Sequence, residues 1–467
     1  MDRKLILLIA AIVAVASTTS NAAAHTIPRT AAAGKNAVLP ALMNAAYGGY
    51  TTVIFIENVS HLSQTAHITI TYFTADGIVA GVGDTNTGLP LWNQWRVRQN
   101  NGHSFATGGA GWGVVNSDQE LAIFVNELAP GSGMDGSSYT SIQVPGGTAT
   151  TLYAPTIVKN AYGGYTTGIG LVNDGANSAT VGIDYRDQTG ALKKHQTVTV
   201  AANGYAGLYS GDPTLGLPDG FTGTATIVNT SQSPTPLGAI VNETGPGGQF
   251  SSYDAVAVVA NTLYVPAAMH NAYGGYNTGI GLQNTGGAGS VTVSYYDASG
   301  TPSGYVTNSI PAFGYLGVYQ GAVDGPPASD SGYTAVITST VPLAGIVNEV
   351  APGGAQSTSF NTETAGSGYL NFAYVDTVGG PYGISTGLAL MNITAATLNF
   401  TLTYHYNVSF VATYSLSLPA HGFMGRYTPS DLQCCVAGIA LALPDTPGLA
   451  GIANEAGTGT LMSYNGQ

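Results

Sequence analysis

The sequence predicts an all-β protein made of four consecutive β-sandwich units, and three observations support this fold class. Several sequence markers recur four times, in the same order, along the 467 residues. The recurrent segments alternate apolar and polar residues, as half-buried strands do. Charged residues make up only 7% of the chain, against roughly 25% in an ordinary soluble protein, which argues against coiled coils and long solvated helices. Apolar residues reach 44%, enough for a large core.

The N-terminal residues have the features of a secretory signal peptide. A short charged start (residues 1–4) precedes a 13-residue apolar run (residues 5–17), and Ala22–Ala24 fits a small-x-small cleavage site. A membrane anchor is the alternative, but the run is too short to span a bilayer comfortably. Removal of residues 1–24 leaves 9 basic and 23 acidic residues, a net charge of −14. We expect an exported, secreted or cell-surface protein without membrane insertion of the mature chain, and its acidity opposes binding to nucleic acid.

The first repeated marker is the tetrapeptide Tyr-Gly-Gly-Tyr. It occurs at Tyr47–Tyr50, Tyr162–Tyr165 and Tyr273–Tyr276, and a degenerate fourth copy lies at Gly379–Tyr382. Each copy runs into an Asn, and these Asn residues (58, 173, 284 and 392) are 115, 111 and 108 residues apart. A regular spacing of this length indicates repeated structural units of about 110 residues.

The second marker is Asn-Glu, which ends a nearly continuous apolar run in each unit. Its Glu residues are Glu127, Glu243, Glu349 and Glu455. One acid per unit, with no recurrent second acid nearby, does not match the carboxylate pair of a glycosidase. We expect a structural role, in which Asn and Glu end a buried strand and the Asn side chain bonds the backbone of the following Pro-Gly turn. A calcium or ligand role is the alternative.

Period-two alternation places the strands within each unit. Ser290–Tyr296 alternates Val with Ser and Thr, and His67–Tyr72 alternates in the same way. Asp-Gly and Ser-Gly pairs at the strand ends suit hairpin turns. About seven strands of this length in about 110 residues, with no convincing helix, predict an immunoglobulin-like sandwich; a propeller is the alternative. The strands expected in the second unit are Leu152–Val158, Thr166–Val172, Thr180–Tyr185, Gln196–Val200, Gly204–Tyr209, Gly223–Val228 and Leu237–Asn242.

The predicted domain organisation has no long linker between units. We expect a signal peptide (1–24), an N-terminal linker (25–36) and four sandwich repeats (37–140, 141–254, 255–360 and 361–467). The Ser-Ser-Tyr segments at the junctions read as strands that continue into the next unit, and the matching Met462–Asn465 suggests that the fourth unit is complete. Short junctions predict an elongated rod on the order of 150 Å long.

The repeated pieces resemble tandem β-sandwich repeats of bacterial secreted and surface-layer proteins. The resemblance rests on YGGY-x-T-G-I-G-L-x-N, x-V-x-Y-Y-D-x-x-G and L-A-x-I-V-N-E, and it covers nearly the whole mature chain. It implies a stalk, adhesin shaft, filament subunit or wall-associated scaffold, and it brings no catalytic residues with it. The fourth unit departs most from the pattern, which puts a shared YGGY function in doubt there.

The residues show no enzymatic signature. No G-x-S-x-G, H-E-x-x-H or phosphate-loop motif occurs, and no CxxC metal pattern is present. The eight His residues (25, 61, 67, 103, 195, 270, 405 and 421) do not recur at one repeat position; only His103 and His421 share a slot beside a glycine. We therefore expect no enzyme activity, no cofactor and no metal, with a hydrolase site at a repeat junction as a remaining alternative.

The YGGY tyrosines are the main candidate contact residues. They are Tyr47, Tyr50, Tyr162, Tyr165, Tyr273 and Tyr276. We favour a tight turn whose tyrosines pack against the neighbouring unit; an aromatic platform for glycan stacking is the alternative.

The cysteines Cys434 and Cys435 are adjacent, and the sequence has no others. In an exported chain they could pair with each other, cross-link to another chain or stay as free thiols.

These observations together predict a secreted, non-enzymatic structural or cell-surface protein. Low charge with high Gly, Thr and Tyr suits self-association into a filament or layer, or association with other cell-surface components. A carbohydrate-binding adhesin that uses the YGGY loops is the alternative.

Overall fold

The alternating segments form antiparallel strands throughout the computed structural model of the chain. The structure describes residues 34–60, 64–130, 136–144, 147–246, 249–321, 331–354, 356–377, 384–406, 409–432, 437–457 and 460–467. The signal-peptide prediction, most of the predicted linker and the degenerate fourth YGGY copy fall outside these residues.

The strands follow one another in four groups along the chain. The first group is β1 (Gly34–Asn44), β2 (Thr51–Asn58), β3 (Ala66–Phe73), β4 (Val79–Leu89), β5 (Gln94–Arg98), β6 (Gly109–Leu128), β7 (Gly136–Thr140) and β8 (Ile142–Gln143). The second is β9 (Thr151–Lys159), β10 (Thr166–Asn173), β11 (Ala179–Asp187), β12 (Leu192–Val200), β13 (Gly204–Tyr209), β14 (Phe221–Asn229), β15 (Leu237–Thr244) and β16 (Phe250–Asp254). The third is β17 (Ala260–His270), β18 (Asn277–Asn284), β19 (Gly289–Tyr296), β20 (Pro302–Ile310), β21 (Tyr315–Tyr319), β22 (Ser331–Val350) and β23 (Ser357–Asn361). The fourth is β24 (Leu370–Asp376), β25 (Ser385–Asn392), β26 (Leu398–Tyr406), β27 (Ser409–Leu418), β28 (Phe423–Tyr427), β29 (Ala437–Pro444), β30 (Leu449–Gly457) and β31 (Thr460–Asn465).

Helical structure in the described residues is confined to single turns. These are η1 (Gln99–Asn101), η3 (Pro352–Gly354) and α2 (Thr428–Asp431). Among the described helices, none has the length and apolar content needed to cross a membrane.

Each group of strands makes two four-stranded antiparallel rows with the same internal order. In the second unit the rows are β12-β11-β14-β9 and β13-β10-β15-β16. The first and third units have the same pairings, except that β8 adds a fifth strand beside β1 in the first unit. β6 and β22 are each 20 residues long and belong to both rows of their unit. The fourth unit repeats the order as β27-β26-β29-β24 and β28-β25-β30-β31.

The two rows of a unit enclose a shared apolar core, so the prediction of an all-β sandwich is confirmed at this level. In the second unit, Ile183 on β11 and Ile227 on β14 face Leu171 on β10 and Val241 on β15, and all four side chains are buried. Alternation in sequence is therefore alternation between core and solvent.

The strand order differs from that of an immunoglobulin domain. In the immunoglobulin order the first two strands share a sheet, whereas β9 pairs with β14 and β10 pairs with β13 and β15. The physical reason is the turn at 161–165, which carries the chain from one row to the other and does not close a hairpin.

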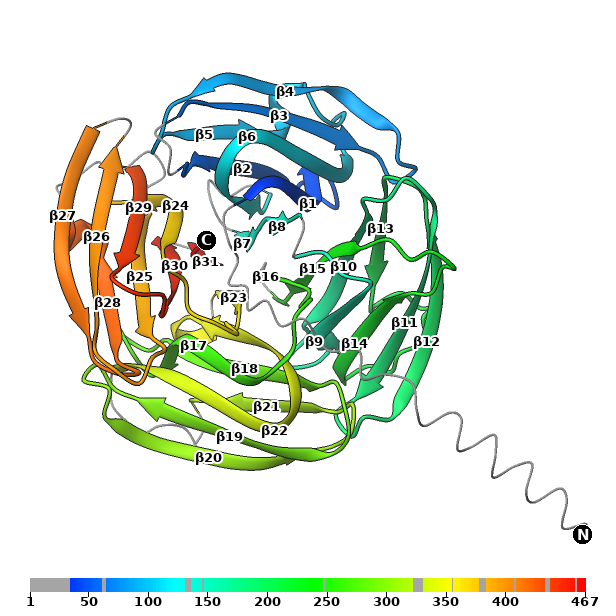
Figure 1. Cartoon of the computed structure of the whole chain (residues 1–467). Coiled ribbons are helices and arrows are strands. Elements are labelled where there is room, and N and C mark those ends of the chain that lie inside the picture. Colours follow the sequence, from blue (N-terminus) through cyan, green and yellow to red (C-terminus); the bar gives the residue numbers. More distant parts are fainter. Residues whose placement is uncertain are drawn as a thin grey trace, which may run out of the picture.

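The units do not form the predicted rod; they close into a ring. Figure 1 shows the four groups of strands arranged around a centre occupied by β7, β16, β23 and β31. Each of these four central strands contacts the next, and β31 contacts β7. The physical reason is that short junctions are compatible with a constant rotation between successive units, and such a rotation can close a ring.

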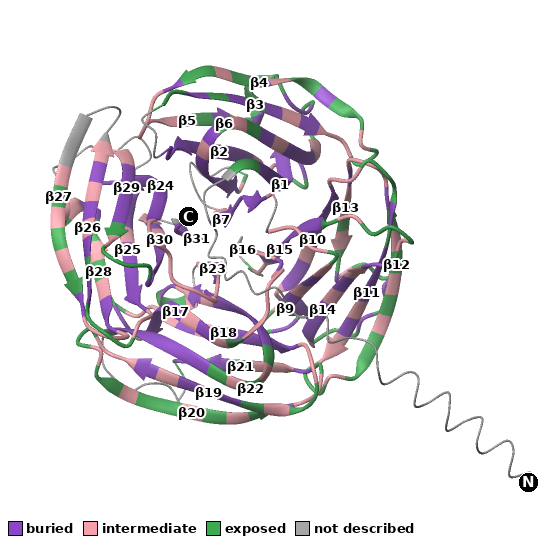
Figure 2. Cartoon of the chain, in the orientation of Figure 1, coloured by how far each residue is buried: buried purple, intermediate pink, exposed green. Residues whose placement is uncertain are grey.

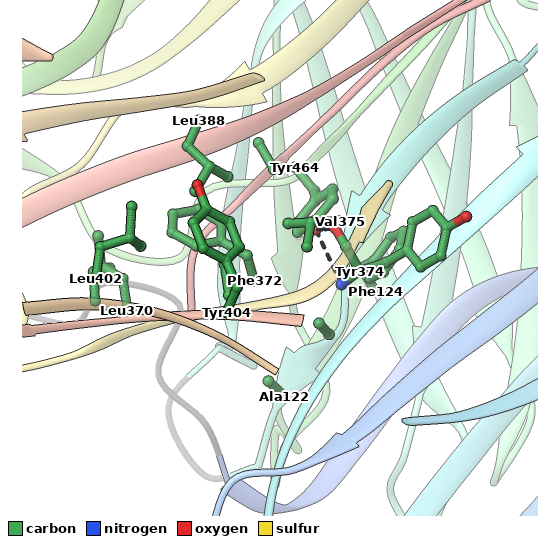
Figure 3. Close-up of a cluster of buried hydrophobic side chains, with 14 of the residues drawn as sticks. Ala122, Phe124, Leu370, Phe372, Tyr374, Val375, Leu388, Leu402, Tyr404 and Tyr464 are labelled. Atoms are coloured by element: carbon green, nitrogen blue, oxygen red, sulfur yellow. Dashed lines mark hydrogen bonds between the residues drawn. The ribbon is translucent and has the colours of Figure 1, made fainter. Parts of the chain in front are cut away.

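Closure joins the first unit directly to the fourth. Phe124 on β6 stacks on Tyr464 of β31, with ring centroids 4.1 Å apart, and Phe55 on β2 lies 5.0 Å from the ring of Tyr374 on β24. Figure 3 shows Phe124, Tyr374 and Tyr464 meeting beside the apolar core of the fourth unit. The first and last units therefore share one continuous core.

Burial increases from the rim of the ring toward its centre (Figure 2). The outermost strand β20 alternates exposed and half-buried residues, whereas β16 and β23 are almost entirely buried. The central strands are those of the Ser-Ser-Tyr segments, which add an eighth strand to the seven expected in the second unit.

Candidate functional site

The YGGY segments form tight turns at the boundaries between units. In the second unit the backbone N–H groups of Gly164 and Tyr165 both donate to the carbonyl of Ala161, at 2.9 and 2.7 Å. Gly163 and Gly164 have φ values of 89° and 124°, which favour glycine. The turns at 46–50 and 272–276 have the same bonds and signs of φ.

The first tyrosine of each turn is exposed and reaches toward the following unit. Tyr47, Tyr162 and Tyr273 are 66%, 64% and 58% exposed. The hydroxyl groups of Tyr47 and Tyr162 interact with the half-buried Tyr205 and Tyr315, respectively, which belong to the following unit. The Tyr273 hydroxyl lies close to Gly332 and to Gly425 on β28.

The second tyrosine of each turn is half-buried against the central strand of the following unit. Tyr50 lies 5.0 Å from Phe250 on β16, between ring centroids. Tyr165 lies beside Ser357 at the start of β23, and Tyr276 shares a cavity with Leu461 on β31. The turns therefore sit where one unit meets the next.

The Asn-Glu pairs form a cyclic set of hydrogen bonds around the centre. Neighbouring residues in a strand point to opposite faces, so each Asn faces the preceding unit and each Glu faces the following one. The Asn side-chain amides donate from Asn126 to Glu455 (3.4 Å), from Asn242 to Glu127 (3.0 Å), from Asn348 to Glu243 (3.2 Å) and from Asn454 to Glu349 (2.8 Å).

This arrangement corrects part of the sequence interpretation. Asn and Glu do end buried strands, but the Asn side-chain amides donate across the unit boundary, and among the described residues none of them bonds to the following Pro-Gly turn. In three of them the side-chain carbonyl oxygen accepts from a serine of the central strand: Ser138 to Asn126 at 2.6 Å, Ser359 to Asn348 at 2.7 Å and Ser463 to Asn454 at 2.7 Å. Ring closure places these partners together, and no local turn motif encodes it.

The central carboxyl groups are buried without a cationic partner in the described residues. Burial raises the pKa of Glu127, Glu243 and Glu349 to about 7 and the pKa of Glu455 to about 8, and the hydrogen bonds that they accept oppose this rise. Near neutral pH these groups therefore exchange between neutral and charged forms.

Two cavities open at successive unit boundaries, and each contains a pair of YGGY tyrosines. The cavity between the second and third units has a volume of about 730 Å³ and is lined by Tyr162, Tyr165, Tyr315, Tyr319 and Glu243 among others. Only one of its lining residues, Glu243, is charged. Cavities of this size and apolar character are typical of small-molecule sites.

The cavity between the third and fourth units has a volume of about 640 Å³. Tyr273, Tyr276 and Glu349 take the equivalent places, but the wall also contains Arg426. This guanidinium pairs with Asp431, with Nε at 2.9 Å from Oδ2. The two cavities thus share tyrosines and a buried carboxyl group but differ in charge.

No histidine lines either of these two cavities. His67, His103 and His195 each pair with an Asp through Nδ1 at 2.7 Å. His195 also lies 3.2 Å from the Thr197 hydroxyl, which gives the order of groups found in a hydrolytic triad. Both residues are exposed on β12, outside the two cavities described above.

Some predicted residues fall outside the described part of the chain. Cys434 and Cys435 are among them, as are His25 and His61. Within the described residues, no group of three or more His, Cys, Asp or Glu side chains is placed to hold a metal ion.

Sequence reasoning missed the tyrosines that complete the cavity walls. Tyr205 and Tyr315 receive the first YGGY tyrosine of the preceding unit, and Tyr319 lines the same wall as Tyr315. The sequence feature that could have identified them is the recurrent segment NGYAGLYS and its counterpart FGYLGVY, in which two tyrosines lie four residues apart. In a strand this spacing places both rings on one face.

Comparisons with known proteins do not assign a family. No family model matches the sequence, and no curated protein matches it. A structure titled as Thermotoga maritima 1070 aligns with 24% of this chain and 95% of its own, at 13% identity and a TM-score of 0.20. A β-glucuronidase of glycoside hydrolase family 2 aligns with 50% of this chain and 24% of its own, at 10% identity and a TM-score of 0.11. TM-scores this low carry no argument about fold or function.

Proposed function

We propose that the chain is an exported, non-enzymatic surface protein, whose ring acts as a structural module that associates with further copies through its rim. The observation that carries this proposal is that the outermost strands have one unpaired edge each. β12 and β20 stand at the ends of their rows and pair on one side only, with β11 and β19. Unpaired strand edges are templates for pairing with another chain.

The edge of β20 suits association better than the edge of β12. β20 has no charged residue and exposes Tyr305 to 74%, whereas β12 contains Lys193 and Lys194. Lysines on an edge oppose pairing between molecules. Assembly through β20 would extend outward from the rim and leave the central hydrogen bonds intact.

Negative-stain microscopy and light scattering of the purified mature chain test this proposal. We expect ordered assemblies, and we expect Tyr305→Lys to lower the assembled fraction roughly tenfold at an unchanged melting temperature. Gln188→Lys, which adds the same charge in the exposed turn before β12, serves as the control and should assemble normally. A wild-type chain that stays monomeric at all concentrations would refute assembly.

A second candidate is a glycan-binding adhesin. It is favoured by the recurrence of an exposed tyrosine at Tyr47, Tyr162 and Tyr273, because exposed aromatic rings can stack on sugar faces. Retention on a glycan array that is lost in Tyr162→Ala, with thermal stability unchanged, would support it. Loss of stability without any sugar retention would leave packing as the role of these tyrosines.

A further inference from the structure

The three YGGY boundaries are alike in their turns but differ in the size of the residue at the start of the following central strand. In each unit the residue that follows the Asn-Glu pair is paired with one residue of the central strand. That central-strand residue is Phe250 in β16, Ser357 in β23 and Leu461 in β31. At the first boundary Phe250 packs on Tyr50. At the second boundary the small Ser357 leaves the space open, and the 730 Å³ cavity lies there.

The hydrogen bonds of the central Glu residues differ between the same boundaries. Glu127 has both carboxyl oxygens occupied, by Asn242 at 3.0 Å and by the Ser252 hydroxyl at 2.5 Å. Glu243 is 4% exposed, and its Oε2 accepts from Asn348 and Ser251. Its Oε1 is buried and has no hydrogen-bond partner in the described part of the chain.

A buried carboxylate oxygen without a partner is costly, and a ligand that supplies a positive charge removes that cost. Four tyrosines stand around the same space, and a cation over a tyrosine face is attracted by the ring. No Lys, Arg or His lines this cavity to neutralise Glu243.

We propose that the cavity between the second and third units binds an organic cation of the alkylammonium class, with Glu243 as counter-ion and Tyr162, Tyr165, Tyr315 and Tyr319 as an aromatic enclosure. The proposal goes beyond the surface role and does not rest on it. Burial already holds the pKa of Glu243 at about 7, so an arriving cation meets a carboxyl group that can ionise at neutral pH. At the next boundary the guanidinium of Arg426, which pairs with Asp431, also lines the cavity, and its charge close to Glu349 disfavours a second cation there.

The test is calorimetric titration of the full mature chain with choline and with its uncharged isostere 3,3-dimethyl-1-butanol. We expect one choline site per chain and an affinity for choline roughly tenfold or more above that for the alcohol. Glu243→Gln should remove this preference, while Glu127→Gln, the equivalent change at the boundary where Phe250 packs on Tyr50, should leave it unchanged.

Ser357→Phe provides a second variant that tests the site without weakening the carboxyl network. It copies the residue that the first boundary already accommodates, and it should abolish choline binding at an unchanged melting temperature. Equal affinity for choline and the alcohol, choline binding that survives both Glu243→Gln and Ser357→Phe, or retention of neutral sugars without choline would overturn the proposal. None of these outcomes depends on whether the rim assembles.

Discussion

In the part of the chain that the structure describes, the central carboxyl groups are strongly buried and form no ion pair with a cation. Glu127, Glu243, Glu349 and Glu455 are at most 4% exposed, and each accepts from an uncharged amide. An amide donor stabilises a neutral carboxyl group and a carboxylate, but it does not repay the cost of burying the charge. The centre of the ring is therefore most stable when these groups are protonated.

We predict that the protein loses stability as pH rises from 5 to 8.5. The unfolded pKa of Glu is near 4.5, and the folded values are about 7 for three groups and about 8 for Glu455. A folded pKa above the unfolded one gives stability that is complete below pH 4.5 and is lost as pH rises through the folded pKa. Each group can contribute up to about 1 kcal/mol per pH unit in this window. Thermal melts across the range should show a falling Tm.

Single substitutions identify the groups responsible. Glu349→Gln should reduce the slope of Tm against pH by no more than about a fifth, because burial also raises the pKa of Glu363 to about 8 and the substitution removes one of at least five such groups. Asp212→Asn is the matched control: hydrogen bonds from Thr214 hold the pKa of this exposed carboxyl below its usual value, so it does not titrate in this window. A Tm that is flat or rising between pH 5 and 8.5 would contradict the assignment.

At the scale of elements, alternation was sufficient to place the strands. Seven strands expected in the second unit correspond to β9 through β15, each within four residues at either end. The partner of each strand could not be read from the same pattern, because alternation tells which side faces the core and not which strand lies beside it. The sequence indicated that the YGGY segment is a turn, but it did not indicate that this turn connects two different rows of strands.

The two positions of the turn require glycine for different physical reasons. Gly163 has φ of 89° with nothing near its missing Cβ, so only backbone conformation requires glycine there. At the equivalent of its neighbour, Gly49 has φ of 120° and a Cβ would lie 2.7 Å from Pro130. The turn is thus held by conformation at one position and by conformation and contact at the next.

We predict that Gly163→Ala lowers the free energy of unfolding by about 1 kcal/mol, the usual cost of a left-handed non-glycine residue. Denaturant titration measures it. Gly387→Ala in β25 is the control, since its Cβ meets no atom within 4 Å and its φ is not positive; it should change stability by less than about 0.5 kcal/mol. Equal effects of the two substitutions would show that the turn does not need its conformation.

At the scale of the whole molecule, the sequence does not specify closure in any single motif. Repetition and short junctions are compatible with a rod and with a ring, and the difference is the rotation between successive units. The residues that carry closure are interface residues such as Phe124 and Tyr464, whose rings lie 4.1 Å apart although they are 340 positions apart in sequence. The apolar character of these rings predicted that they are buried, but it could not predict which residues they pack against.

Solution scattering distinguishes the two shapes directly. A compact ring of this length should have a radius of gyration of about 22 to 25 Å, whereas a thin rod of roughly 150 Å would have about 43 Å. We expect the compact value in monomeric samples, measured at low concentration so that rim association does not contribute. The pair-distance distribution should also end far below 150 Å, because the first and fourth units contact each other through β7 and β31. A radius near the rod value would mean that this contact opens in solution, and the hydrogen bond from Asn126 to Glu455 would be absent with it.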